Sequence, residues 1–227
     1  RADALKAIRS FRPEEVDEST VRAQYTKGSF GGEEVKGYRE EEGVPKESVT
    51  ETYAAVRLQV NTWRWAHTPF LLRSGKRLPR RATEIVIQFR RVPHSIFAGK
   101  GATTQPNRLI IGIQPEENIR LSVMAKVPGL DRGGLRLREV PLDISMPNAF
   151  AGVKKRIAYE RLLLDFIEGD QTLFVRRDEV EAQWDWIDTI RAGWSEHGMT
   201  PKPYTAGSWG PSAAIALAER EGVTWHE

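Results

Sequence analysis

The feature that most constrains the fold is a repeated alternation of apolar and polar residues through the middle of the chain. Apolar side chains recur at every second position over residues 56–60, 85–89, 109–113 and 119–123, with a weaker candidate over 135–144. A period of two is typical of a strand with one buried face. No helical pattern separates these segments, so we expect them to form one antiparallel sheet with a covered face and a more polar face. Pro115 opens a short polar segment that predicts a hairpin between two of the strands.

The hydrophobic period becomes helical in the last third of the chain. Apolar residues at helical spacing occur over residues 159–167, 180–194 and 211–221. Gly169 is a typical helix stop, and Asp178 with Glu181 resembles a capping box for the second helix. Strands followed by helices indicate the α+β class. We expect a large, mainly antiparallel sheet with helices packed on one face.

The remaining segments give weaker signals. Residues 1–50 are polar and rich in Gly and Glu, and they predict only short helices and a long loop. We find no internal repeat and no linker, so we expect residues 1–227 to form a single domain. Because the first residue is Arg1 rather than Met, we also expect the chain to be a fragment, a processed product or a renumbered piece of a longer protein.

Composition excludes several kinds of chemistry. The chain has no cysteine, which rules out disulfides, thiolate catalysis and Cys-ligated zinc. The histidines at 67, 94, 197 and 226 lack the spacing of metal ligands, so we expect no metal. A net charge of +3 from 34 basic and 31 acidic residues argues against a dedicated nucleic-acid partner. No apolar run reaches the roughly 18–20 residues that span a bilayer. We expect no membrane partner and a cytoplasmic location.

A cluster of cations follows an aromatic and apolar run. Ser74 and Gly75 predict a tight turn next to that apolar wall. Four basic residues follow it, namely Lys76, Arg77, Arg80 and Arg81. They could form a phosphate site, with Lys as a compact charge and Arg as a forked donor. A solvated basic loop is the alternative, and the residues alone favour it, because no aromatic residue lies between these cations.

Motifs are distributed over nearly the whole chain. Residues 63–78 fit the pattern W-R-W-x-x-x-P-F-x-x-R-[ST]-G-K-x-L. Further motifs are R-A-Q-Y at 22–25, G-Y-x-E-E-x-x-V-P at 37–45, T-E-T-Y at 50–53, K-V-P-G at 126–129, A-Y-E-R-L at 158–162, F-V-R-R-D-E at 174–179 and Y-T-A-G-S-W-G-P at 204–211. In content and order, this series resembles the C-terminal domain of glucose-6-phosphate dehydrogenases.

The resemblance implies an activity and a set of substrate contacts. Enzymes of this family oxidise D-glucose 6-phosphate with NADP to 6-phospho-D-glucono-1,5-lactone, the first step of the pentose phosphate pathway. The Lys of their S-G-K turn contacts the sugar phosphate and corresponds to Lys76. A basic residue five positions later, often Lys in the family, corresponds to Arg81. A Gln that precedes Pro at a strand end corresponds to Gln114, which from the residues alone would be an ordinary sheet-edge amide. The family's large sheet also implies a homo-oligomer, which we expect to be a dimer.

The motifs of the family's nucleotide-binding half do not occur in the sequence. No Gly-rich dinucleotide fingerprint follows a strand, and the family's catalytic His–Asp pair and D-H-Y-L-G-K segment have no counterpart. The resemblance therefore implies that NADP binds to an absent N-terminal Rossmann domain. We expect no catalytic or cofactor-binding residue here and no activity from this chain alone.

Two further expectations come from departures from the family pattern. In the family that this sequence resembles, some relatives bind a second, structural NADP on this domain through extra basic and aromatic residues. Gly112, Ser122 and Trp209 stand at such positions here, so we expect no structural NADP. His67 stands where most relatives carry Gly, and we assign it a role in the loop or in packing rather than in catalysis.

Two alternatives from other functional classes stay open. A structural or assembly module would associate with itself but bind no sugar phosphate. A nucleic-acid binder would use the basic segment over residues 73–81, and its affinity would fall steeply with salt as counterions are released.

Overall fold

The structure is a computed structural model that describes residues 2–92, 94, 105–128, 136–152 and 157–227. The chain divides into two compact units, described separately below. The first comprises Arg1–Arg80, Arg156–Trp225 and Glu227, and the second comprises Arg81–Lys155 and His226. That residues 1–227 act as a single domain stays a prediction. None of the described helices is both long and apolar enough to cross a membrane.

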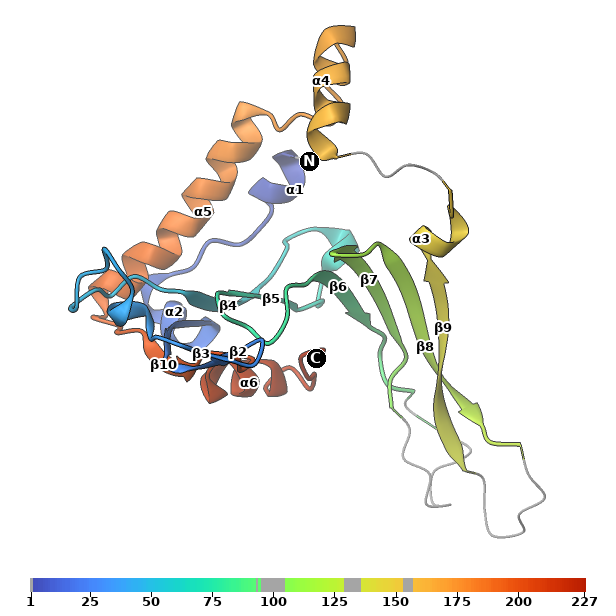
Figure 1. Cartoon of the computed structure of the whole chain (residues 1–227), viewed down its shortest axis with the longest axis horizontal. Helices are drawn as coiled ribbons and strands as arrows, with labels where there is room; N and C mark the ends of the chain where they lie inside the picture. The colour runs from blue at the N-terminus through green and yellow to red at the C-terminus, as the bar shows by residue number, and fades with distance from the viewer. Residues whose placement is uncertain (1, 93, 95–104, 129–135, 153–156) are drawn as a thin grey trace. The chain divides into compact units, whose positions relative to one another are not determined.

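A four-stranded sheet organises the first unit (Figure 1). Its order is β10 (Lys202–Thr205), β1 (Thr20–Thr26), β4 (Tyr53–Leu58) and β5 (Phe70–Gly75). Neighbouring strands are antiparallel except β10, which pairs with β1 in parallel so that Tyr204 lies beside Tyr25. Tyr53 pairs with Gly75. The sheet therefore brings the start of β4 beside the end of β5, and it adds a segment from near the C-terminus to its far edge.

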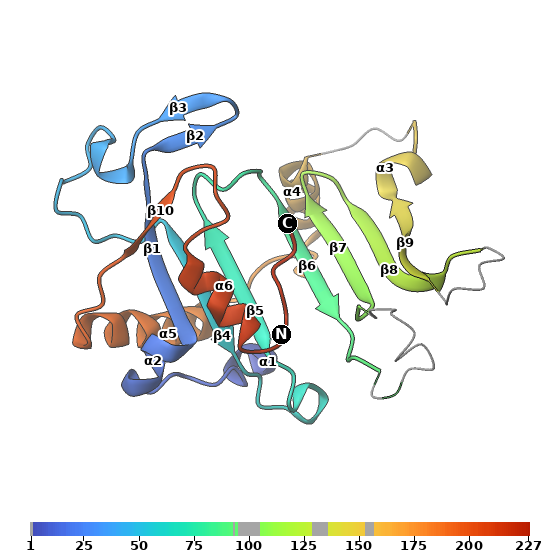
Figure 2. The same ribbon diagram turned by 90° about the horizontal axis from the view of Figure 1, so that it is seen from below.

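Helices cover both faces of this sheet. Buried side chains of β1 and β4, such as Ala23 and Ala55, pack with α6 (Ser212–Glu219) on one face. Val56 packs on the other face with residues of α2 (Pro13–Ser19) and α5 (Arg177–Glu196) (Figure 2). The expected α+β class, with antiparallel sheets and helices, is confirmed. The expectation that helices pack on only one face is wrong for this sheet, because its central strands bury side chains on both faces.

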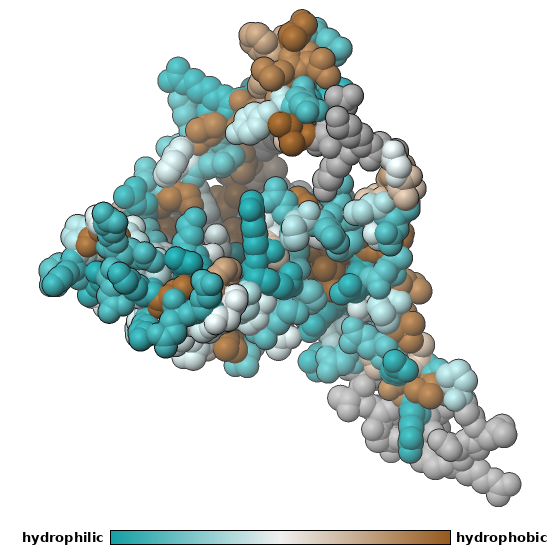
Figure 3. Space-filling model, in the orientation of Figure 1, coloured by the Kyte–Doolittle hydropathy of each residue, from teal (hydrophilic) through white to brown (hydrophobic). Residues whose placement is uncertain are grey.

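Short elements complete the first unit. They are α1 (Ala2–Lys6), the hairpin of β2 (Gly28–Phe30) and β3 (Glu33–Val35), the 3-10 helices η1 (Tyr38–Glu40) and η2 (Trp63–Trp65), and α4 (Ala158–Glu168). The predicted apolar stripe of α4 is present but exposed, as the accessibilities of Tyr159, Phe166 and Ile167 illustrate. Figure 3 shows hydrophobic residues gathered on the surface over this helix. The capping interaction of α5 differs from the predicted pair of Asp178 and Glu181. This helix begins earlier, at Arg177, and the Arg176 N–H donates to the Glu179 carboxylate at 3.2 Å.

The second unit contains a separate antiparallel sheet. Its strands, in order, are β6 (Thr83–Gln88), β7 (Arg108–Gln114), β8 (Asn118–Lys126) and β9 (Leu137–Ser145), followed by α3 (Met146–Ala149). The strands that we predicted as one sheet are thus divided between the two units. The reason is that β4 pairs with β1 and β5, neither of which the sequence analysis predicted. The K-V-P-G motif ends at residue 129, which lies outside the described residues.

We predict that Gly193 is required for the close contact between α2 and α5. A Cβ atom at Gly193 would lie 2.5 Å from Cγ2 of Val16, which is fully buried. Overpacking of this kind costs about 1–3 kcal/mol, and a Cβ contact as short as 2.5 Å belongs to the upper part of this range, above the roughly 1 kcal/mol that Ala gains over Gly inside a helix. Gly193→Ala should therefore lower the free energy of unfolding of the purified chain in urea. Adding Val16→Ala should recover part of the loss, and two strictly additive losses would contradict a direct clash.

Tyr53 provides a test of core packing through pH. Burial raises the pKa of Tyr53 to about 12, against the opposing effect of the Arg73 guanidinium. The unfolded chain releases this proton near pH 10, so folding stability should fall as the pH rises from about 10 to about 12. Tyr53→Phe should lose less stability over this window in urea unfolding. Tyr159→Phe, at an exposed ring of α4, is the control, and an equal pH dependence in all three proteins would contradict the prediction.

Candidate functional site

The bend after β5 differs from the predicted turn. Ser74 and Gly75 belong to the strand, and the chain bends at Lys76 and Arg77. Arg77 has the positive φ, at 53°, a conformation that favours glycine. Gly75 is needed for a different reason: a Cβ atom there would lie 2.6 Å from Cδ2 of Tyr53. The glycine therefore allows close packing behind the bend rather than the bend itself.

Three hydrogen bonds from distant segments hold the backbone of this bend. The Lys76 N–H donates to the Thr52 carbonyl at 2.8 Å, and the Tyr204 hydroxyl donates to the Lys76 carbonyl at 2.6 Å. The Gly207 N–H donates to the Arg77 carbonyl at 2.7 Å. Because residues before β4 and around β10 supply these contacts, the position of Lys76 depends on the tertiary fold rather than on the local sequence.

The arginines beside Lys76 already have partners. The Arg73 guanidinium lies over the rings of Trp209 and Trp225, 4.6 and 4.9 Å from their centroids. Arg77 forms an ion pair with Glu41 at 3.3 Å. No aromatic residue lies between these cations in the sequence, but the fold supplies aromatic rings from the C-terminal segment.

Lys76 differs from its basic neighbours. It is exposed, and its ammonium group has no hydrogen bond or ion pair with any residue that the structure describes. A lysine with a fixed backbone and an unpaired, accessible ammonium group is suited to bind an anion, since a charge-assisted hydrogen bond can form without breaking an existing one.

Arg81 and Gln114 lie in the second unit, and the fold brings them to the same end of two paired strands. Gln114 ends β7 and pairs with Thr83 at the start of β6. Arg81 precedes Thr83 by two residues, and both predicted side chains are exposed. Lys76 belongs to the first unit. The structure therefore groups two of the three predicted substrate contacts.

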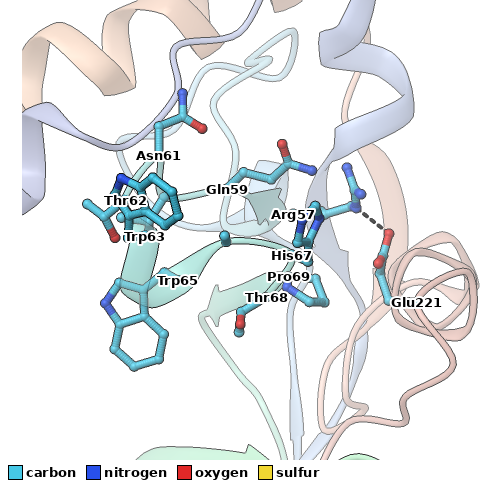
Figure 4. A pocket seen from close by; sticks show the side chains of 12 residues that line it. Arg57, Gln59, Asn61, Thr62, Trp63, Trp65, His67, Thr68, Pro69 and Glu221 are labelled. Atoms are coloured by element: carbon cyan, nitrogen blue, oxygen red, sulfur yellow. Dashed lines mark hydrogen bonds and ion pairs between the residues drawn. The ribbon is translucent and has the colours of Figure 1, made fainter.

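A pocket of about 660 Å³ is lined mainly by the segment that connects the end of β4 to the start of β5 (Figure 4). Lys76 follows the other end of β5. The pocket lining includes Trp63, Trp65 and His67, together with an ion pair between Arg57 and Glu221. The sequence predicts an apolar wall beside Lys76. This prediction is wrong, because β5 separates the aromatic run from Lys76. The sequence signal for this pocket was the W-R-W motif, whose Trp63 is fully exposed.

The geometry of His67 agrees with a role in the loop. Its φ is 63°, in the left-handed region that glycine adopts without steric cost. Within the described part of the chain, no group of three or more His, Asp or Glu side chains is placed to hold a metal ion.

Comparisons with known proteins agree with the resemblance in sequence. Residues 1–226 match the family model described as glucose-6-phosphate dehydrogenase, C-terminal domain. The chain is 56% identical over 230 residues to a glucose-6-phosphate 1-dehydrogenase of Zymomonas mobilis, covering all of this chain and 47% of that protein. It is 51% identical over 231 residues to the enzyme of the same name from Rhizobium meliloti, again over its whole length and 46% of the relative.

Solved structures give the same result. A glucose-6-phosphate dehydrogenase in complex with its substrate glucose-6-phosphate superposes with a TM-score of 0.83 at 29% identity, over all of this chain and 44% of that one. A glucose-6-phosphate 1-dehydrogenase from Mycobacterium avium superposes with a TM-score of 0.73 at 34% identity, over all of this chain and 43% of the other. The chain thus spans about half the length of the relatives it matches. It belongs to the glucose-6-phosphate dehydrogenase C-terminal domain family.

Proposed function

We propose that this chain is the substrate-binding and oligomerisation half of an NADP-dependent glucose-6-phosphate 1-dehydrogenase. The enzyme would oxidise D-glucose 6-phosphate at C1 to 6-phospho-D-glucono-1,5-lactone and so open the pentose phosphate pathway. Family membership supports this proposal, as do the names of relatives at 56% and 51% identity. A solved relative with glucose-6-phosphate bound supports the substrate. A cytoplasmic location, without nucleic-acid or membrane partners, is part of the same proposal and rests on the family resemblance.

The observation that best supports the proposal is the way the fold fixes the backbone of Lys76 and leaves its side chain exposed. Its backbone is fixed by Thr52 and Tyr204, while its ammonium group is exposed and has no partner among the described residues. We assign Lys76 to the sugar phosphate, with Arg81 and Gln114 as further contacts. The family resemblance supports all three assignments, and Arg81 and Gln114 lie at the same end of two paired strands in the second unit.

This half would bind and orient the substrate but would not perform the oxidation. Lys76 and Arg81 would neutralise the phosphate through charge-assisted hydrogen bonds, and the Gln114 amide would hydrogen bond a sugar hydroxyl. NADP accepts the hydride when it is bound. The described residues offer no strand, Gly-rich turn and helix of the kind that binds a dinucleotide. We therefore assign NADP and the catalytic base to the part of the enzyme outside this chain.

A second, structural NADP is not part of the proposal. Trp209 stands at a position where some relatives carry a cation, and its ring lies under the guanidinium groups of Arg73 and Arg80, at 4.6 and 5.5 Å. Trp225 lies against Arg73 as well. Both rings are thus already in contact with cations of the chain itself, which argues against their use for a nucleotide.

Replacing Lys76 tests the substrate assignment. In the full-length enzyme, Lys76→Ala should raise the KM for glucose 6-phosphate roughly ten- to a hundredfold, because a charge-assisted hydrogen bond is worth about 1.5–3 kcal/mol. The KM for NADP and the melting temperature should not change, since the Lys76 side chain is exposed. Lys202→Ala, at an exposed lysine of β10 in the same sheet, is the matched control. An unchanged KM for glucose 6-phosphate would favour the alternative of an assembly module.

The sheet of the second unit supports the proposed dimer. Its register aligns Ile85, Ile111, Ile119 and Ile144 in one row across β6 to β9, and Ile87, Leu109, Leu121 and Leu142 in the next. The outer members of both rows are exposed, with Leu142 and Ile144 each at 55%. An apolar face of this extent marks a contact surface, and we assign it to a second copy of the chain.

A pair of lysine substitutions on β9 tests this face. Leu142→Lys places a charge on the apolar face, and Glu139→Lys places one on the opposite face of the same strand. In light scattering of the enzyme at micromolar concentration, the parent and Glu139→Lys should be dimeric, whereas Leu142→Lys should dissociate because the charge would be buried without a partner. A monomeric parent, or a dimer that survives Leu142→Lys, would contradict the assignment.

A further inference from the structure

The side chain of Tyr204 connects the last strand of the first unit to the backbone of Lys76. Tyr204 is buried, and its hydroxyl donates to the Lys76 carbonyl at 2.6 Å. The same hydroxyl lies 3.3 Å from both the hydroxyl and the carbonyl oxygen of Thr52. Since a tyrosine has only one O–H to donate, the short contact identifies the Lys76 carbonyl as its main acceptor. The Thr52 hydroxyl can then donate to the Tyr204 oxygen.

The ring that carries this hydroxyl is firmly held. β10 pairs in parallel with β1, which places Tyr204 directly beside Tyr25. The Tyr204 ring also packs against the rings of Tyr53 and Tyr25, with centroids 5.4 and 6.4 Å away. A residue 128 positions after Lys76 in the sequence therefore delivers a hydroxyl to a fixed point under the bend.

The Lys76 carbonyl is a sensitive point of the bend. The next residue, Arg77, has a φ of 53°, so the peptide that joins Lys76 to Arg77 is held in a conformation that non-glycine residues rarely adopt. Without the Tyr204 hydroxyl, this carbonyl would lose its partner inside the protein, and the peptide could rotate to hydrogen bond with water. The bend that presents the Lys76 ammonium group would then be held by two hydrogen bonds instead of three, and its position would be less well defined.

We propose that Tyr204 is a positioning residue for Lys76, which it holds through the backbone so that the ammonium group meets the phosphorylated sugar. This inference rests on the proposed function, because it assumes that Lys76 binds that substrate. Tyr204 itself does not touch the substrate in this account.

The test removes only the hydroxyl, in the full-length enzyme. Tyr204→Phe should raise the KM for glucose 6-phosphate about two- to tenfold, the range that corresponds to one hydrogen bond between neutral groups. The KM for NADP should not change, and kcat should stay within about twofold. Tyr38→Phe is the matched control, because Tyr38 packs against the same core and should leave both KM values unchanged.

A double-mutant cycle separates positioning from general destabilisation. In a Lys76→Ala background, Tyr204→Phe should have no further effect on the KM for glucose 6-phosphate, since no ammonium group remains to be positioned. An equal effect in both backgrounds would overturn the proposal, and so would a Tyr204→Phe enzyme with an unchanged KM when Lys76→Ala raises it. If Lys76→Ala alone leaves the KM unchanged, the proposed function itself fails.

A second variant covers the case in which Tyr204→Phe folds poorly. Thr52→Val removes the hydroxyl that lies 3.3 Å from the Tyr204 oxygen while it leaves the tyrosine in place. It should raise the KM for glucose 6-phosphate in the same direction but by less, and again only when Lys76 is present. No change in KM with Thr52→Val, in an enzyme whose Lys76→Ala variant is impaired, would count against positioning through this pair.

Discussion

The hydrogen bond from the Tyr204 hydroxyl to the Lys76 carbonyl is the contact on which the rest of this account depends. It exists because β10 adds to β1 in parallel and because the rings of Tyr53 and Tyr204 pack against each other in the core. Gly75 has no side chain, which leaves room for the Tyr53 ring behind the bend. The core of the first unit and the presentation of the candidate binding residue are therefore parts of one packing arrangement.

The fold also resolves the problem of several cations in one segment. Like charges placed together without counterions are unfavourable, and the sequence alone suggests that an anion must relieve this repulsion. The structure shows a different solution, in which Arg73 lies against two tryptophan rings and Arg77 pairs with Glu41. Contacts of a cation with a ring contribute about 0.5–2 kcal/mol, which is as much as or more than a typical exposed ion pair contributes. What distinguishes Lys76 from Arg73 and Arg77 is thus not the density of charge around it but its lack of a partner among the described residues.

The sequence predicts the regular elements better than their arrangement. The alternating period located β4 and the strands of the second sheet, since each of these has a continuous apolar row. β1 also alternates, with Val21, Ala23 and Tyr25 buried together. The sequence does not predict it as a strand, because it lies within a largely polar segment of the chain. β10 is too short for a period and contains Pro203. The family motifs pointed to Lys76, yet its contact with Tyr204 joins residues 128 positions apart, which no local pattern encodes.

The most direct measurement is a crystal structure of the full-length enzyme with glucose 6-phosphate bound. The account predicts that the Lys76 ammonium group lies about 2.7–3.2 Å from an oxygen of the sugar phosphate, while the Tyr204 hydroxyl still donates to the Lys76 carbonyl. A sugar phosphate bound instead in the pocket of Trp63 and Trp65, with Lys76 remote from it, would contradict the central claim.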